Sequence, residues 1–195
     1  MKKYELLVED TITFFGVQLF RIKALISFSG IEKGEVGGYI ASEKNLSQSG
    51  NAWVYGNAWV YGDAEVYGNA DVYGDAEVSG NAKVYGNAKV YGDAEVYGDA
   101  EVYGNADVYG DAKVSGNAKV YGNADYIVFK NTWSSGRYFT YTKSNKNWRV
   151  GCFYGSGAEL VEKAYKDSKK SGDFYKAYVD FVEKLEEIEN IHKEQ

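Results

Sequence analysis

The chain has 195 residues, of which 45% are hydrophobic and 26% are charged, so it can form a hydrophobic core and is not a disordered protein. Its formal net charge is −6, and its single cysteine and single histidine exclude an internal disulfide framework, a cysteine-cluster metal site and most histidine-dependent catalysis. Proline is absent, whereas 23 glycines and 19 tyrosines indicate a repeated sequence.

The sequence also lacks the features of a membrane or secreted protein. No apolar run approaches the roughly 20 residues that cross a bilayer. The first six residues, Met-Lys-Lys-Tyr-Glu-Leu, become acidic too early for a signal peptide. We therefore expect a cytoplasmic protein with no membrane partner.

Residues 1–49 carry no repeat and are expected to form a β-rich N-terminal cap. The pattern predicts strands at 4–8 and 11–15, followed by an apolar stretch at 17–28 that includes two basic residues. A Gly-Gly-Tyr-Ile turn at 37–40 and a Ser-Glu-Lys-Asn-Leu-Ser segment at 42–47 then lead into the repeat. The end of a solenoid needs a cover against water and strand addition, and we assign that role to this segment.

A six-residue unit, Gly-Asn/Asp-Ala-x-Val-Tyr/Ser, occurs twelve times without a break from Gly50 to Tyr121, and a decayed thirteenth unit follows. The valine of each unit is expected to point inward, because a β-branched side chain suits a strand. The alanine two residues earlier is also expected inside, at a corner with little room. Glycine followed by Asn or Asp is typical of a bend that requires unusual backbone angles.

This pattern resembles the hexapeptide-repeat family, whose fold is the left-handed parallel β-helix. The resemblance covers residues 50–125 and implies a triangular coil in which three hexads, or eighteen residues, complete one turn. Twelve hexads then make about four coils. With the Gly-Gly-aromatic-Ile turn and the Ser-Glu-Lys-Asn-Leu-Ser-Gln segment, the chain is similar to hexapeptide-repeat proteins of phages and prophages, which are often labelled transferase-like or polymer-forming.

An eighteen-residue period arranges the outward side chains in columns along the helix. The first tyrosine column contains Tyr55, Tyr73, Tyr91 and Tyr109, and the second contains Tyr67, Tyr85, Tyr103 and Tyr121. The third column alternates tyrosine and serine at Tyr61, Ser79, Tyr97 and Ser115. An amide ladder is expected at Asn69, Asn87, Asn105 and Asn123. Charges of alternating sign occur at Glu65, Lys83, Glu101 and Lys119, where opposite charges would lie on neighbouring coils.

Residues 126–195 are predicted to form a small α+β module. Strands are expected at 126–129, 137–142 and 148–153, with turns at 134–136 and 144–147. Helices are expected at 158–169 and 173–192, the second because Phe174, Tyr178, Phe181, Leu185 and Ile188 recur at helical spacing. The phage-type proteins carry a comparable tail with a Gly-Cys-Phe-x-Gly turn, which matches residues 151–155.

The sequence predicts no catalytic site, no cofactor and no metal site. Hexapeptide-repeat acyltransferases use a histidine as general base together with loops extruded from the coils, whereas this chain has no coil insertion and its only histidine, His192, lies in the C-terminal tail. Arg149 lies three residues from Cys152, so an activated thiolate is conceivable, but a half-buried structural cysteine is the favoured interpretation. The acidic corner column of Asp75, Asp93 and Asp111 lacks a dedicated calcium loop, and a solvated corner is favoured there.

Charge is distributed unevenly along the chain. Residues 50–125 contain twelve acids and four lysines, whereas residues 126–150 contain five cations and no acid, interleaved with aromatic residues. One interpretation is that this basic segment binds nucleic acid or another polyanion. The favoured interpretation is that it complements an acidic solenoid, its own or that of a second subunit.

We predict a non-enzymatic binding or scaffolding protein that acts through protein–protein contacts, because tyrosine is enriched at interfaces. The expected partners are further copies of the chain, as a homodimer or homotrimer, and a host protein. Inhibition of a host defence factor is implied only by the phage resemblance. The alternatives are an acyltransferase-like enzyme and an acidic mimic of nucleic acid. The candidate interface residues are Tyr55, Tyr73, Tyr91, Tyr109, Tyr67, Tyr85, Tyr103, Trp53, Trp59, Arg137, Lys143, Lys146, Trp148 and Arg149.

Overall fold

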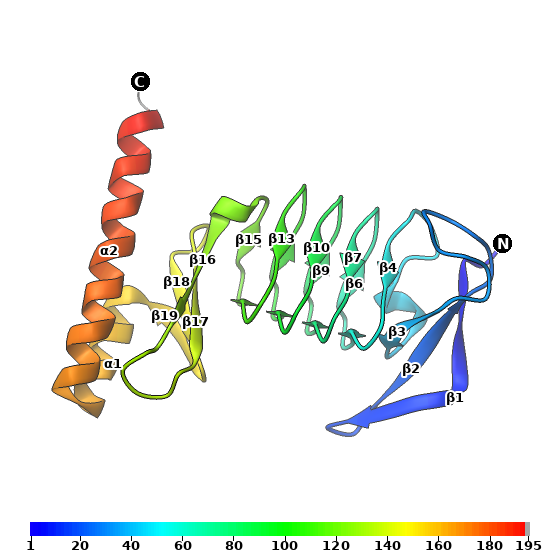
Figure 1. Cartoon of the computed structure of the whole chain (residues 1–195), viewed down its shortest axis with the longest axis horizontal. Coiled ribbons are helices and arrows are strands. Elements are labelled where there is room, and N and C mark those ends of the chain that lie inside the picture. The colour runs from blue at the N-terminus through cyan, green and yellow to red at the C-terminus, as the bar shows by residue number, and fades with distance from the viewer. Residues whose placement is uncertain (194–195) are drawn as a thin grey trace.

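A parallel β-solenoid of about five turns forms the middle of the molecule, between an N-terminal β-sheet extension and a C-terminal module of strands and helices (Figure 1). The computed structural model describes residues 1–193. The predicted mainly β fold with a parallel β-helix is confirmed. Within the described residues, neither helix is both long and apolar enough to cross a bilayer.

Twelve two-residue strands, one from each hexad, form the three walls of the solenoid. They are β4 (Trp53–Val54), β5 (Trp59–Val60), β6 (Glu65–Val66), β7 (Asp71–Val72), β8 (Glu77–Val78), β9 (Lys83–Val84), β10 (Lys89–Val90), β11 (Glu95–Val96), β12 (Glu101–Val102), β13 (Asp107–Val108), β14 (Lys113–Val114) and β15 (Lys119–Val120). One wall stacks β4, β7, β10 and β13, the second stacks β6, β9, β12 and β15, and the third contains β5, β8, β11 and β14. Each strand from β4 to β12 pairs in parallel with the strand one turn later, as Val90 pairs with Val108, so the predicted eighteen-residue period is confirmed.

The valine and the alanine of every hexad fill the interior of the solenoid. From Ala52 to Val120 these side chains are at most 1% exposed, as the inward assignment predicted. Glycine is required at the bends because neighbouring coils approach closely there. At Gly74 the φ angle is +74°, and a Cβ atom would lie 3.0 Å from the backbone nitrogen of Gly92 on the next coil.

The N-terminal segment is continuous with one wall of the solenoid. Strands β1 (Tyr4–Phe14) and β2 (Val17–Ala24) form an antiparallel hairpin, β2 pairs with β3 (Val36–Ile40), and β3 pairs in parallel with β5. The two strands expected at 4–8 and 11–15 are one strand, whose register with β2 shifts between Leu7 and Thr11. A β-bulge of this kind bends a strand without ending it.

Stacking of coils begins at β3 rather than at Gly50. Ile40 lies beside Val60, and Leu46, after the short 3-10 helix η1 (Glu43–Asn45), forms a parallel bridge to Val66. Both side chains are fully buried and occupy the inward positions that valine fills later. They form an incomplete first turn ahead of the four expected coils.

The C-terminal module is an antiparallel sheet covered by two helices. Its strands, in spatial order, are β16 (Tyr126–Lys130), β17 (Tyr138–Thr142), β18 (Asn147–Val150) and β19 (Phe153–Ser156), and its helices are α1 (Gly157–Asp167) and α2 (Lys169–Lys193). The strand expected at 148–153 is two strands, because Gly151 adopts a φ of +57° and reverses the chain. The red C-terminal part of α2 projects beyond the sheet (Figure 1).

The C-terminal sheet also covers the last coil. A strand at the end of a solenoid has backbone N–H groups without a following strand, and side chains accept their hydrogen bonds here. The N–H of Lys113 donates to Thr140 Oγ1 at 2.9 Å, and that of Lys119 donates to Ser144 Oγ at 2.7 Å. The short 3-10 helix η2 (Asn123–Asp125) joins the solenoid to this sheet.

Candidate protein-binding surface

The tyrosine columns cover much of their own apolar surface. In the first column, Tyr73 and Tyr91 stack with ring centroids 4.7 Å apart and planes 2° apart. In the second, Tyr67 stacks on Tyr85 at 4.9 Å and Tyr85 on Tyr103 at 5.1 Å. Because stacked rings hide one another's faces, these columns present ring edges and hydroxyl groups. A broad apolar strip is therefore not present along the middle coils.

Three of the column tyrosine hydroxyls donate to acidic residues of the next coil. Tyr85 donates to Glu101 Oε2 at 2.9 Å, Tyr55 donates to Asp71 Oδ1 at 3.4 Å, and Tyr61 donates to Glu77. Burial, with the neighbouring carboxylates adding to it, raises the pKa of Tyr85 to about 12. These hydroxyls stay protonated at neutral pH and serve to hold coil to coil.

The columns end in exposed rings where the solenoid meets the C-terminal module. Tyr109 is 51% exposed and Tyr121 is 62% exposed, whereas the other rings of these two columns are half-buried. Tyr109 lines a cavity of about 510 Å³ with Tyr126 and Tyr138. An aromatic contact surface therefore exists at the ends of the columns rather than along them.

The asparagine ladder is present, but it begins and ends one coil earlier than predicted. The side-chain amides of Asn51, Asn69, Asn87 and Asn105 hydrogen-bond in series at 3.0–3.1 Å. Asn123, expected as a member, instead accepts a hydrogen bond from the backbone N–H of Asp107, because it lies in η2 and no longer follows the coil. Within residues 1–193, no group of three His, Cys, Asp or Glu residues is placed to hold a metal ion.

Two of the three tryptophans expected at the interface are buried. Trp53 is fully buried beneath the N-terminal hairpin, against Tyr4 and Phe28, so it cannot contact a partner. Trp148 is 1% exposed, because α1 and α2 cover the face of the sheet on which it lies. Trp59 is half-buried against Phe14.

Most of the basic residues at 126–150 interact within the chain. Lys143 forms an ion pair with Glu189, and Lys146 pairs with Glu186 at 3.4 Å, both on α2. Arg149 lies over the Tyr97 ring of the solenoid at 5.1 Å. The expected complement was the acidic solenoid, but two of the cations pair with the helix instead. The reason is that α2 packs across the sheet and brings its own acidic residues to these lysines.

Helix α2 carries an apolar stripe that is only partly covered, since Phe174 stacks on Trp133 and Phe181 lies against Phe129 of β16. Phe174, Phe181, Ile188 and Ile191 are each 40–55% exposed, whereas Tyr175, Val179 and Val182 form the buried face. The helical spacing in the sequence predicted the helix correctly but did not distinguish these two faces. The only sequence signal for the exposed stripe was that the helix contains more apolar residues than one buried face can hold.

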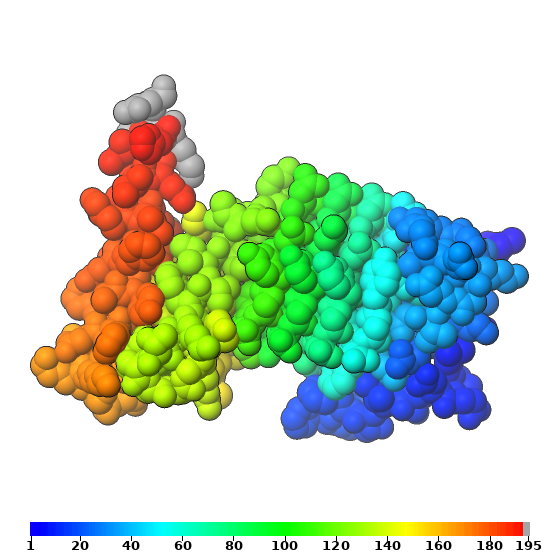
Figure 2. All heavy atoms as spheres, in the orientation of Figure 1, coloured from blue at the N-terminus to red at the C-terminus, as the bar shows by residue number. Residues whose placement is uncertain are grey.

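The exposed end of the second tyrosine column and the apolar stripe meet at one groove. Tyr103, Tyr121 and Ile188 line it, and its volume is about 820 Å³. Its other lining residues are Lys119, Ala124, Asp125, Lys143, Ser144, Glu189 and His192. Figure 2 shows the projecting end of α2 standing apart from the body of the solenoid. His192, the last residue of the helix predicted at 173–192, lies in α2 at the edge of this groove.

The other charged candidate, Arg137, lies elsewhere, at a cleft in the C-terminal module. The structure thus brings together Tyr103 and Lys143 of the predicted interface, and adds Tyr121 and Ile188, which were not predicted. Compared with protein-family models and with curated protein sequences, the chain matches no family and no curated protein.

Proposed function

We propose that this chain is a non-enzymatic binding or scaffolding protein whose partner docks in the groove between the second tyrosine column and helix α2. One observation carries the proposal. Tyr121, at 62% exposure, and Ile188, at 43%, line the same open groove, while the rest of the column is stacked on itself. Large exposed aromatic and aliphatic side chains gathered at one place are typical of protein contact surfaces.

The charged rim of the groove suits a protein partner better than a polyanion. Lys143 is already paired with Glu189, and Asp125 and Glu189 add negative charge beside the two lysines. A polyanion would have to displace these internal contacts and would meet the acidic residues. A protein partner with an apolar centre and a rim of both charges would not need to displace these contacts.

The partner in this proposal is a second copy of the chain, giving a homodimer or homotrimer, or a host protein. The unbroken hexapeptide repeat and the segment at 42–48 support a protein of the phage or prophage hexapeptide-repeat type. Inhibition of a host defence factor belongs to the same hypothesis. The acyltransferase alternative has less support, because the coils carry no insertion that could form an acceptor site.

The test compares Ile188→Glu with Val8→Glu, a matched change of an exposed aliphatic residue at the opposite end of the molecule. We expect light scattering to report an assembly larger than a monomer for the wild type and for Val8→Glu, and a monomer for Ile188→Glu. If the wild type is a monomer, affinity capture from bacterial host extract is expected to retain a protein that Ile188→Glu loses.

Three results would contradict the proposal. The first is that the Ile188→Glu variant still forms the assembly. The second is that Ile188→Glu and Val8→Glu lose the assembly to the same extent. The third is that the wild type is a monomer and captures no protein that the Ile188→Glu variant loses. A rise of melting temperature with coenzyme A would instead favour the acyltransferase alternative, because a ligand that binds only the folded state raises its apparent stability.

A further inference from the structure

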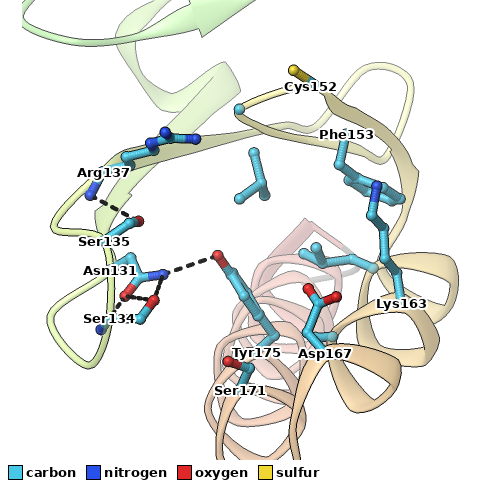
Figure 3. A pocket seen from close by; sticks show the side chains of 14 residues that line it. Asn131, Ser134, Ser135, Arg137, Cys152, Phe153, Lys163, Asp167, Ser171 and Tyr175 are labelled. Atoms are coloured by element: carbon cyan, nitrogen blue, oxygen red, sulfur yellow. Dashed lines mark hydrogen bonds between the residues drawn. The ribbon is translucent and has the colours of Figure 1, made fainter.

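A separate cleft of about 300 Å³ lies inside the C-terminal module (Figure 3). It shares no lining residue with the groove. The loop after β16, the turn between β18 and β19, helix α1 and the start of α2 form its walls. Val150, Phe153, Leu160 and Ala164 provide apolar lining. Its volume is at the lower end of the range for small-molecule sites.

Three charged side chains line this cleft, namely Arg137, Lys163 and Asp167. None of the three forms a side-chain hydrogen bond or an ion pair with any residue in the described range 1–193, although Lys163 lies 5.7 Å from the centroid of the Phe153 ring. Eight other charged residues of these helices are paired, in Lys166–Glu162, Lys169–Asp173, Lys176–Asp180 and Lys184–Glu187. The cleft therefore gathers free charges of both signs at one place.

The two cations approach the cleft from opposite walls. Figure 3 shows Arg137 extending from the loop side and Lys163 rising from α1 on the other side. The Arg137 guanidinium lies along the turn at Gly151, where a Cβ atom would be 3.4 Å from Nη1. A bidentate donor such as arginine matches the geometry of a carboxylate.

A buried hydroxyl at the cleft has a proton without an acceptor. Tyr175 is 8% exposed, and its hydroxyl oxygen accepts a hydrogen bond from Asn131 Nδ2 at 3.2 Å. Asn131 is itself buried and is fixed by Ser134, whose backbone N–H donates to Asn131 Oδ1 at 3.0 Å. No residue in the described part of the chain accepts the Tyr175 proton. Burial raises the pKa of Tyr175, so this hydroxyl keeps its proton at neutral pH and can donate it to a ligand oxygen.

We propose that this cleft binds a small α-amino acid with an apolar side chain. The carboxylate of the ligand binds between Arg137, Lys163 and the Tyr175 hydroxyl, and its ammonium group binds Asp167. The side chain of the ligand contacts Val150, Phe153 and Leu160. A zwitterion fits better than a simple anion, because Asp167 would repel an anion that brings no positive charge of its own.

The test titrates the full-length protein with three compounds of similar shape, followed by calorimetry and by amide chemical-shift changes. They are leucine, the amine that lacks its carboxylate (3-methylbutylamine), and the acid that lacks its ammonium group (4-methylpentanoate). The same comparison is made for valine, isoleucine, methionine and phenylalanine, each with its own amine and acid analogues. We expect at least one of these five amino acids to bind at least about tenfold more tightly than its two analogues.

Variants assign the contacts. Arg137→Gln and Asp167→Asn are each expected to weaken binding by about tenfold or more, and Tyr175→Phe by a smaller factor. Lys166→Gln, an exposed α1 residue that does not line the cleft, is the matched control and should bind like the wild type. Melting temperatures of all four variants establish that each is folded.

Two outcomes would overturn the proposal. The first is that no amino acid of the panel binds at millimolar concentration. The second is that the acid analogue binds as tightly as the amino acid and Asp167→Asn changes neither affinity, which would make the cleft a plain anion site.

Discussion

At the scale of single residues, each position of the hexad meets a different physical demand. The valine and alanine side chains are at most 1% exposed, whereas the residue between them is charged in ten of the twelve hexads. Glycine holds the bend because the neighbouring coil leaves no room for a Cβ atom, as at Gly74. The repeat is therefore a set of local requirements that recur every six residues.

The inward and outward positions of one strand can be tested at Val90 and Lys89. Val90 is fully buried in the middle of the solenoid, so Val90→Asp places an unpaired carboxylate in an apolar interior and is expected to cost about 4 kcal/mol or more. Lys89 is exposed, and Lys89→Ala should change the free energy of unfolding by less than about 0.5 kcal/mol. Urea unfolding followed by circular dichroism measures both, and equal midpoints would show the assignment to be wrong.

At the scale of elements, the coils are held by contacts between equivalent side chains one turn apart. Tyrosine rings stack, asparagine amides hydrogen-bond in series, and Lys119 pairs with Glu101 at 3.3 Å. Exposed pairs of this kind each contribute little. Every one of these contacts needs a neighbouring coil, so the two ends of the solenoid require other partners.

At the C-terminal end, side-chain oxygens of the C-terminal module accept hydrogen bonds from backbone N–H groups of the last coil, and Thr140→Val tests their contribution. The substitution keeps the shape of this buried residue but leaves the N–H of Lys113 without an acceptor, so a loss of about 1–3 kcal/mol is expected. Ser144→Ala is the control, because Ser144 is exposed and water can replace its bond to Lys119. Chemical denaturation should therefore show a larger loss for Thr140→Val; an equal or larger loss for Ser144→Ala would contradict this account.

At the scale of the whole molecule, the chain forms two hydrophobic cores. The solenoid core runs from Tyr4 to Tyr126, and a second core forms between the C-terminal sheet and the helices around Phe139 and Trp148. The N-terminal end is closed differently from the C-terminal end. Lys3 is buried there and donates to the carbonyl of Ala52 at 2.8 Å, and burial lowers its pKa to about 8.

The tyrosines whose pKa is raised predict loss of stability at alkaline pH. Burial raises the pKa of Tyr55, Tyr61, Tyr85 and Tyr126 from 10.0 to about 12. Between these values the folded state retains protons that the unfolded state releases, so the stabilisation is complete below pH 10 and is lost as the pH rises toward 12. Melting temperatures should fall across this window.

The tyrosinate absorbance of the folded protein measures the same effect. Part of the 19-tyrosine signal should titrate near pH 12, and Tyr85→Phe should remove one residue from that part. A single transition centred at pH 10 for all tyrosines, with melting temperatures that stay constant up to pH 12, would contradict the prediction.

The sequence by itself determined the solenoid. The hexads predicted the inward valines, the eighteen-residue period and the columns, because each contact in a coil lies at a fixed distance along the chain. The same reasoning did not find the start of stacking, since Ile40 and Leu46 lie twenty residues from Val60 and Val66 and do not follow the repeat.

Only the tertiary structure decided which surfaces are free. Trp53 and Trp148 have the sequence context of exposed strand residues, yet the hairpin and the helices bury them. Lys143 pairs with Glu189, and Ile188 lines the groove with Tyr121, only because α2 folds back across the sheet. Such contacts join residues far apart in the chain, and no local pattern encodes them, because they depend on how separately folded elements pack.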